Sequence, residues 1–174
     1  MTKKEFFREV TKGKTDLLQE FVVLLKKKKI PFCIIGGLGV NAYAEPVVSL
    51  DLDVVVVAQQ IKELQEIFVK KYKVKEYPHS VNISSPFSDL RIQIQTDSRY
   101  QDFIKRAKNK DVLGYALPVA AIEDVLQGKI WAALDESRRP SKRQKDLADI
   151  LRLLETRKVL AKRIPHSLKR RLSL

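Results

Sequence analysis

The 174-residue sequence contains one cysteine, two histidines and no long apolar run. Because Cys33 is alone, no disulfide can form within the chain, and a cysteine-based zinc site is not expected. The longest near-continuous apolar run, from Val54 to Ala58, is far shorter than the roughly 20 residues that cross a bilayer. The charged N-terminus lacks the apolar stretch of a secretory signal. We therefore expect a cytoplasmic protein that does not enter a membrane.

Two common kinds of catalytic motif are also missing from the sequence. There is no Walker A phosphate-binding loop and no Ser-His-Asp arrangement. Neither His79 nor His166 has the neighbours of a metal ligand or a general base. Zinc chemistry and nucleophilic hydrolysis are therefore not expected.

Acidic residues are scarce at the C-terminal end, where positive charge collects. Of the formal net charge of +13, residues 138–174 carry +10, because they contain 13 Lys and Arg residues and only three acids. A basic tail on a nearly neutral domain favours a polyanionic partner such as RNA, DNA or nucleotide phosphates. A solvated, partly disordered tail would explain the same charge. Since apolar residues are few after Pro165, we expect that end of the chain to fray.

Hydrophobic periodicity predicts a mixed α/β domain. The predicted helices span residues 3–29, 38–44, 60–71, 102–108, 120–134 and 142–154. The predicted strands span residues 32–35, 50–58, 72–77, 81–84, 89–95 and 115–119. The clearest strand is 50–58, because Val54 to Val57 are all β-branched, and we expect it to be central and buried on both faces.

Asp51 and Asp53 lie at the start of this clearest strand. Residues two apart on a strand point to the same face, so both carboxylates project together. Like charges at this spacing repel each other, and desolvating either one alone is costly. A hard cation such as Mg²⁺ removes both costs and keeps coordination sites open for phosphate oxygens. The alternative is a strand end at which two acids meet solvent.

Gly36 and Gly37 follow an apolar strand and open a short helix. Glycines allow close backbone approach, and helix N–H groups can hold a phosphate. A pair of glycines also marks ordinary tight turns. Its position shortly before Asp51, with Ser49 between them, favours a combined phosphate and metal site.

Asp89 is the natural third carboxylate. It starts a strand whose polar and apolar residues alternate, so pairing beside the strand of Asp51 would bring it to the same edge. A third acid can help to hold a second ion or can deprotonate an attacking hydroxyl. The alternative is a capping or surface aspartate.

Lys129 lies in an otherwise apolar stretch of predicted helix. A lone ammonium in that setting needs a partner, and a triphosphate or Asp146 would serve. Asp146 and Asp149 are three residues apart on the last predicted helix, so they could flank Lys129 or the cleft. The alternative is a lysine that extends to the surface.

Taken in order, these motifs resemble the pattern of the polymerase-β-type nucleotidyltransferase superfamily. More narrowly, residues 34–154 are similar to the AbiEii-like nucleotidyltransferase toxins of abortive-infection toxin–antitoxin systems. In that family a Gly-rich turn, an Asp-x-Asp strand, a lysine on a later helix and a final Asp-x-x-Asp helix follow one another. The matching residues are Ile34-Ile35-Gly36-Gly37, Ser49, Asp51, Asp53, Asp89, Lys129, Asp146 and Asp149. Relatives often carry an arginine or another polar residue shortly before Asp-x-Asp, where this chain has Pro46-Val47-Val48.

The resemblance implies a minimal nucleotidyltransferase fold, with a mixed central sheet flanked by helices and a C-terminal helical segment. It implies an N-terminal helical segment packed on the domain (residues 1–30) and a nucleotidyltransferase core (31–118). A C-terminal helical pair (119–156) would complete the cleft, followed by the basic tail (157–174).

The resemblance also implies an enzyme that uses Mg²⁺ or Mn²⁺ to transfer a nucleoside monophosphate from an NTP to a hydroxyl. The implied metal ligands are Asp51, Asp53 and Asp89, and the implied catalytic residues are these three with Lys129, which offsets developing negative charge. The implied nucleotide-binding residues are Gly36, Gly37, Ser49, Lys129 and Asp146.

Several partners and one other class of function remain open. The acceptor could be a tRNA end, a protein side chain or a small molecule, and the basic tail favours RNA. The chain could pair with a second protein in a toxin–antitoxin system. The alternative to an enzyme is a non-catalytic module of the same fold that binds nucleotide or RNA, or acts as an antitoxin.

Overall fold

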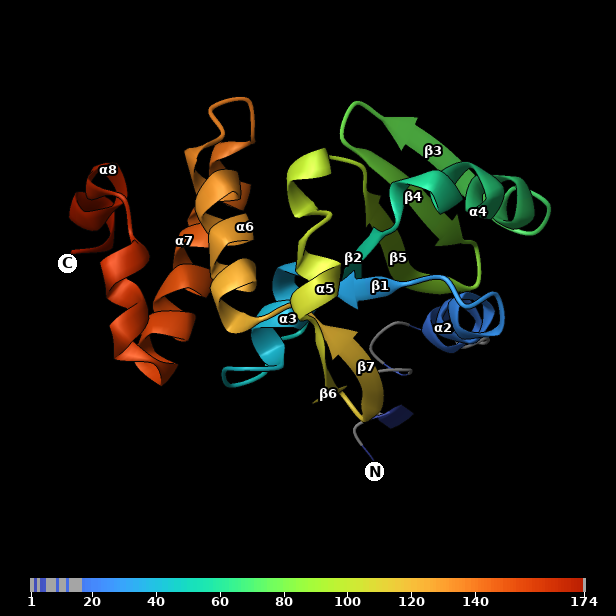
Figure 1. Cartoon of the computed structure of the whole chain (residues 1–174), viewed down its shortest axis with the longest axis horizontal. Helices are drawn as coiled ribbons and strands as arrows, with labels where there is room; N and C mark the ends of the chain where they lie inside the picture. Colours follow the sequence, from blue (N-terminus) through green and yellow to red (C-terminus); the bar gives the residue numbers. More distant parts are fainter. Residues whose placement is uncertain (1, 3, 6–8, 10–11, 13–16, 174) are drawn as a thin grey trace.

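A computed structural model describes residues 2, 4–5, 9, 12 and 17–173 of the chain. Its centre is a seven-stranded sheet in the order β3-β4-β5-β2-β1-β7-β6 (Figure 1). The strands are β1 (Phe32–Ile34), β2 (Asp51–Val56), β3 (Lys73–Tyr77), β4 (Ser80–Ser85), β5 (Ser88–Gln95), β6 (Lys108–Val112) and β7 (Tyr115–Val119). β2 pairs with β5 and β1 with β7 in parallel, and the other neighbours are antiparallel. The predicted mixed sheet is confirmed.

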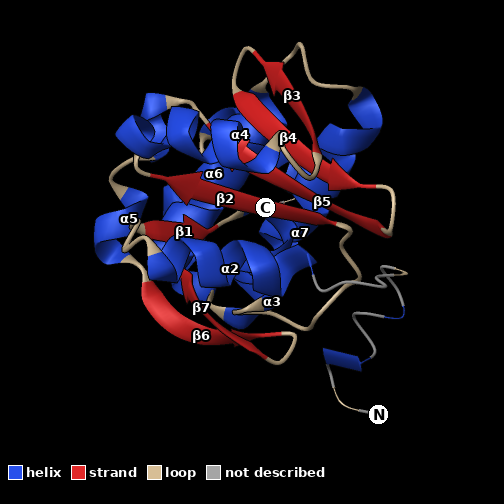
Figure 2. Cartoon of the chain, turned by 90° about the vertical axis from the view of Figure 1, so that its right-hand side faces the viewer, coloured by secondary structure: helices blue, strands red, loops and turns tan. Residues whose placement is uncertain are grey.

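Helices cover both faces of this sheet. The α-helices are α2 (Leu17–Lys27), α3 (Gly36–Asn41), α4 (Ile61–Phe68), α5 (Phe103–Arg106), α6 (Ile122–Leu134), α7 (Pro140–Thr156) and α8 (His166–Lys169). Short 3-10 turns are η1 (Ala58–Gln60), η2 (Ser98–Tyr100), η3 (Lys158–Arg163) and η4 (Arg170–Leu172). Figures 1 and 2 show α2 and α4 on one side of the sheet and α6 and α7 on the other.

Alternation along β2 separates the core from the polar face. Leu52, Val54 and Val56 are buried in the cluster that includes residues of α2 and α4. Asp51, Asp53 and Val55 point to the opposite face, because side chains alternate along a strand. On that face Val55 packs in a second cluster with residues of α6 and α7. The strand is therefore buried on both faces only from Val54 to Val56. Asp51 and Asp53, at its N-terminal end, are partly exposed.

The chain beyond Pro165 does not fray, and that prediction is wrong. Leu160, Ile164, Leu168 and Leu172 are buried in the same cluster as the apolar residues of α6 and α7. These four residues recur every four positions, so that helical turns bring them to one side. In the sequence they are separated by many basic residues. Figure 1 places this segment at the end of the molecule opposite β3.

Two other segments differ from, or extend beyond, what the sequence predicted. The predicted N-terminal helix is confirmed over α2, whereas residues 13–16 and most of those before them lie outside the described residues. Strand β6 was not predicted, because its run Lys-Asn-Lys-Asp-Val has a single apolar residue and no alternation.

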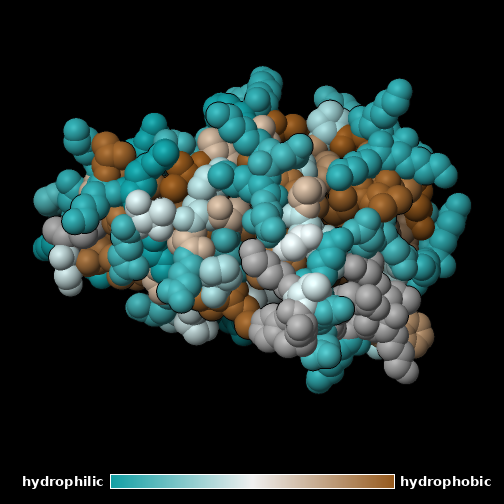
Figure 3. Space-filling model, turned by 90° about the horizontal axis from the view of Figure 1, so that it is seen from below, coloured by the Kyte–Doolittle hydropathy of each residue, from teal (hydrophilic) through white to brown (hydrophobic). Residues whose placement is uncertain are grey.

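The surface of the protein is mainly polar on the face seen from below. Figure 3 shows hydrophilic side chains spread over this face, with the hydrophobic areas broken up between them. Within the described part of the chain, no helix is both long enough and apolar enough to cross a membrane.

Candidate active site

The parallel pairing of β2 with β5 sets which side chains meet at the site. Asp51 lies opposite Arg91, and Asp53 lies opposite Gln93. These four residues share the polar face of the sheet, because each pair of positions is two residues apart. The sequence prediction that the two strands lie side by side is therefore confirmed.

The carboxylate of Asp53 lies directly over Gly36. A Cβ atom added to Gly36 would come within 1.9 Å of Asp53 Oδ2, so a larger residue at this position would displace the carboxylate. Gly36 also has a φ of +64°, which disfavours residues with a side chain. The Gly-rich turn and the Asp-x-Asp strand are thus in contact, as their order in the sequence suggested.

Asp53 is enclosed and has no partner of its own. Within the described residues, its carboxylate makes no hydrogen bond and no ion pair. Burial raises the pKa of the Asp53 carboxyl, and the nearby positive charge of Lys129 opposes this shift. Asp53 is only partly exposed and lines a pocket, and a carboxylate in such a place without a partner is unfavourable, so this position suits a bound cation.

Asp51, in contrast, is already paired. Its Oδ1 accepts hydrogen bonds from Arg91 Nε at 3.0 Å and from Arg91 Nη2 at 2.6 Å. Its Oδ2 lies 3.9 Å from Lys142 Nζ, beyond hydrogen-bonding distance. Asp51 therefore has one engaged oxygen and one that remains available.

Ser49 and Gly37 lie next to each other beside the aspartates. A Cβ atom on Gly37 would approach Ser49 Oγ to 3.1 Å, and Ser49 is buried. The Ser49 hydroxyl donates a hydrogen bond of 3.3 Å to the backbone carbonyl of Asp51. The predicted group of glycines, serine and aspartates is brought together by the fold.

The loop that leads into β2 is held by Asn41 at the end of α3. Asn41 Nδ2 donates to the carbonyl of Val47 at 2.7 Å, and Val47 N donates to Asn41 Oδ1 at 3.1 Å. Arg152 of α7 donates to the same Oδ1 at 2.8 Å. These residues connect α7 to the aspartates, and no motif in the sequence indicated them.

Lys129 is the centre of a buried ion cluster between α6 and α7. Its Nζ lies 2.9 Å from Asp146 Oδ1 and 2.7 Å from Asp149 Oδ2, and its side chain is 9% exposed. Burial disfavours the charged form of Lys129, but the two aspartates outweigh it and raise the pKa above its usual value. Of the two partners that the sequence left open, a triphosphate or Asp146, the structure pairs Lys129 with Asp146.

Two arginines add positive charge to this cluster. Arg138 Nε lies 2.7 Å from Asp146 Oδ2, and Arg152 Nη1 lies 2.8 Å from Asp149 Oδ1. Three cations thus face two aspartates, which leaves a net charge of +1. Lys129 does not present a free ammonium to the cleft, and Arg138 is the more exposed cation, at 38%.

The structure does not bring Asp89 to Asp53. Asp89 precedes Arg91 by two residues and Gln93 by four, so it lies nearer the start of β5 than the positions opposite the two aspartates. Its side chain is half exposed and lies 3.3 Å from Lys12. It shares only an outer groove with Asp51. The expected third carboxylate is displaced because alternation predicts the face of a strand but not its register with a neighbour.

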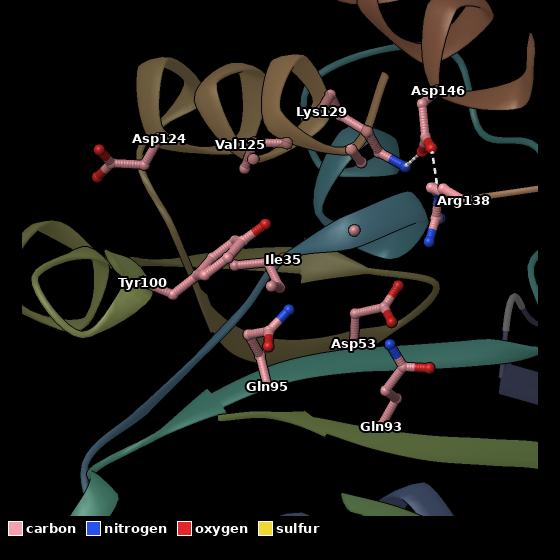
Figure 4. Close-up of a pocket in the computed structure, with 13 residues that line it drawn as sticks. Ile35, Asp53, Gln93, Gln95, Tyr100, Asp124, Val125, Lys129, Arg138 and Asp146 are labelled. Carbon is pink, nitrogen blue, oxygen red and sulfur yellow. Dashed lines mark hydrogen bonds and ion pairs between the residues drawn. The ribbon is translucent and has the colours of Figure 1, made fainter. Parts of the chain in front are cut away.

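A pocket opens between the sheet and α6 (Figure 4). Asp53, Gln93 and Gln95 line it from the sheet, and Lys129 and Tyr100 line it from the helical side. Gln95 Oε1 accepts hydrogen bonds from the backbone N–H groups of residues 96 and 97, so its amide N–H₂ is left for the pocket. The alternation along β5 turns Gln93 and Gln95 toward this pocket, away from the buried Leu90, Ile92 and Ile94.

The pocket continues into a wider groove lined by positive charge. The cationic residues of this groove are Arg99, Arg138, Arg139 and Lys142, and its two acids are Asp135 and Asp97, which pairs with Arg99 at 2.6 Å. Arg138 lines both the pocket and the groove.

Two carboxylates are the most that the protein offers to one ion at this site. Among the described residues, no three His, Cys, Asp or Glu side chains are grouped to hold a metal ion. Asp51 and Asp53 would therefore share an ion with oxygen atoms of a substrate or water, an arrangement that Mg²⁺ accepts.

Fold and site together define a nucleotidyltransferase-type α/β domain with its cleft between the sheet and a helical pair. The sequence model of one family, described as "Nucleotidyl transferase AbiEii toxin, Type IV TA system", matches residues 36–173. The chain belongs to this AbiEii family and is a nucleotidyltransferase.

Solved structures share this fold at low sequence identity. The antibiotic-resistance factor ANT(2'')-Ia is 15% identical, with a TM-score of 0.61 over 90% of this chain and 91% of its own. A nucleotidyltransferase-like protein from Paracoccidioides brasiliensis is 14% identical, with a TM-score of 0.57 over 97% and 89%. The lincosamide antibiotic adenylyltransferase LnuA is 13% identical, with a TM-score of 0.54 over 81% and 98%. No curated protein sequence matches the chain.

Proposed function

We propose that this nucleotidyltransferase uses a divalent ion held by Asp51 and Asp53 to transfer a nucleoside monophosphate from an NTP to a hydroxyl of RNA. The observation that carries the proposal is the enclosed Asp53 carboxylate, seated over Gly36 and without a protein partner. It opens into the same pocket as the Lys129 cluster, so phosphate groups in the pocket would lie between an ion and positive side chains.

The residues present fit Mg²⁺ or Mn²⁺. Asp53 offers an unpaired carboxylate, and Asp51 offers its Oδ2 atom. When bound, the ion would neutralise phosphate charge and polarise the bond to the α-phosphorus. The remaining contributions come from the chain itself.

Each group of side chains has a separate task in this proposal. The backbone at Gly36 and Gly37, with the Ser49 hydroxyl, would hold the phosphates. The Lys129 cluster would orient α7 against the cleft, and Arg138 would supply positive charge to the departing pyrophosphate. Asp89, half exposed and displaced along β5, has no part in it.

The transfer balances without any further reagent. The acceptor oxygen forms a bond to the α-phosphorus, and the bond from that phosphorus to the β-phosphate oxygen breaks. The electron pair leaves with pyrophosphate, and the hydroxyl proton is released. The chain contributes position and charge, which are the main protein contributions to phosphoryl transfer.

An RNA acceptor is favoured by the cationic groove. Arg139 and Lys142 line it next to the pocket, and phosphates of a polynucleotide would neutralise them. Figure 1 shows the folded C-terminal segment on the side of α6 and α7 that faces away from the sheet, so the groove beside the pocket replaces the tail as the proposed contact. A tRNA end is one such acceptor. The family description also makes an antitoxin a natural partner.

The test is pyrophosphate release and label transfer from each of the four NTPs, with bulk tRNA and Mg²⁺. We expect one NTP to be favoured and Asp53→Asn to abolish transfer, because the ion loses its unpaired ligand. Asp89→Asn is the matched control and should retain activity. Loss in both variants would contradict the site, and nucleotide binding without pyrophosphate release would indicate a non-catalytic module.

A further inference from the structure

The site differs from a two-ion centre in the residue that lies opposite Asp51 on the neighbouring strand, which is an arginine and not an acid. Two catalytic ions in such centres lie roughly 3.5–4 Å apart and are bridged by shared oxygen ligands. A third protein carboxylate that helped Asp51 and Asp53 to bind two ions would have to come from the neighbouring strand, about 4.8 Å away. The positions of β5 that lie opposite them hold Arg91 and Gln93, and neither is an acid.

Arg91 cannot bind a metal ion, and it also engages an oxygen of Asp51 that could otherwise bind one. Its guanidinium donates two hydrogen bonds to Asp51 Oδ1, at 3.0 and 2.6 Å, and thereby occupies one of the two oxygens that this carboxylate could offer to an ion. A guanidinium stays protonated at all ordinary pH values, so this cation is permanent. The protein oxygens left for a metal are those of Asp53 and the Oδ2 atom of Asp51.

Charge leads to the same conclusion. Before a nucleotide binds, two carboxylates and one guanidinium sum to −1, and one divalent ion brings the group to +1. A second divalent ion would bring it to +3, with the guanidinium within a few ångströms, where repulsion between like charges is strong. Lys142, whose Nζ lies 3.9 Å from Asp51 Oδ2, adds to this repulsion.

We propose that the site binds a single divalent ion and that Arg91 takes the place of the second ion and its carboxylate. The inference rests on the proposed function, since it concerns the same two aspartates. Arg91 holds Asp51 in position through one edge of its guanidinium. The side chain is 46% exposed and borders an outer groove, so its remaining N–H groups can reach an acceptor or phosphate oxygen there.

The experiment counts bound Mn²⁺ on the full chain by electron paramagnetic resonance, with a non-hydrolysable NTP analogue at saturation. We expect one Mn²⁺ per chain in the wild type. Arg91→Asp restores a carboxylate opposite Asp51 and should raise the count to two, with the spectral broadening of two coupled ions. Arg91→Gln removes the charge without adding a ligand, and its count should stay at one.

The possible results separate this inference from the proposed function. Two ions in the wild type would overturn the single-ion site while leaving a metal-dependent transferase in place. No bound ion in the wild type would contradict the proposed function itself. If Arg91→Asp folds, as circular dichroism would show, and still binds one ion, Arg91 is not what excludes the second. If Arg91→Asp does not fold, a second ion bound by Arg91→Gln would overturn the requirement for a carboxylate.

Discussion

Replacing Gly36 by alanine tests whether this glycine exists to seat the Asp53 carboxylate. The new methyl group would lie 1.9 Å from Asp53 Oδ2 and 2.6 Å from its Cγ atom. The backbone φ of +64° adds a strain of about 1–2 kcal/mol for any residue with a side chain. The substitution therefore has two separable effects, one on stability and one on the position of Asp53.

The size of the second effect follows from the contact distance. To reach ordinary van der Waals contact at 3.4 Å, Asp53 Oδ2 or the new methyl must move by about 1.5 Å. A misplacement of about 1 Å in a catalytic group can lower the rate about 100-fold. We expect Gly36→Ala to lower kcat/KM for pyrophosphate release by about 100-fold or more, and to weaken Mn²⁺ binding in parallel.

Gly114→Ala is the matched control for backbone strain. Gly114 has a φ of +86° in the turn between β6 and β7, away from the aspartates. Urea unfolding should show a loss of about 1–2 kcal/mol in both variants, whereas only Gly36→Ala should lose activity and Mn²⁺ affinity. Wild-type activity and Mn²⁺ affinity in a folded Gly36→Ala protein would refute this account of the glycine.

Three further predictions concern stability and reactivity. Lys129→Met should lower the free energy of unfolding by about 3–5 kcal/mol, because it leaves the buried carboxylates of Asp146 and Asp149 with one cation fewer. Urea unfolding of this variant and of Lys145→Met, a control at an exposed lysine, measures the difference. Equal small losses in both variants would contradict the prediction. Leu168→Ala should cost about 2–5 kcal/mol because Leu168 is fully buried, whereas Val159→Ala, at a residue 60% exposed, should change little; similar values for both would mean that the C-terminal segment is not packed. Burial raises the pKa of the Cys33 thiol to about 12, so iodoacetamide at about pH 8 should label the native protein far more slowly than the protein in urea. Equal labelling rates would show that the thiol is accessible.

The sequence by itself determined those features that depend on neighbouring residues. The β-branched run after Asp53 predicts a buried strand, and spacing by two places Asp51 and Asp53 on one face. The order of the motifs was enough to predict the family, which the match over residues 36–173 confirms. An apolar helix around a single lysine predicts a charged partner, and Asp146 is that partner.

Only the tertiary structure decided which side chains meet across strands and between helices. The register of β2 against β5 places Arg91, and not Asp89, beside Asp51. The C-terminal segment folds because Leu168 and its apolar neighbours find a surface on distant helices. Hydrophobic periodicity reflects the repeat of a helix or strand, which depends only on residues close together in the sequence. Register and packing instead minimise the free energy of the whole chain, so they depend on residues far apart in the sequence.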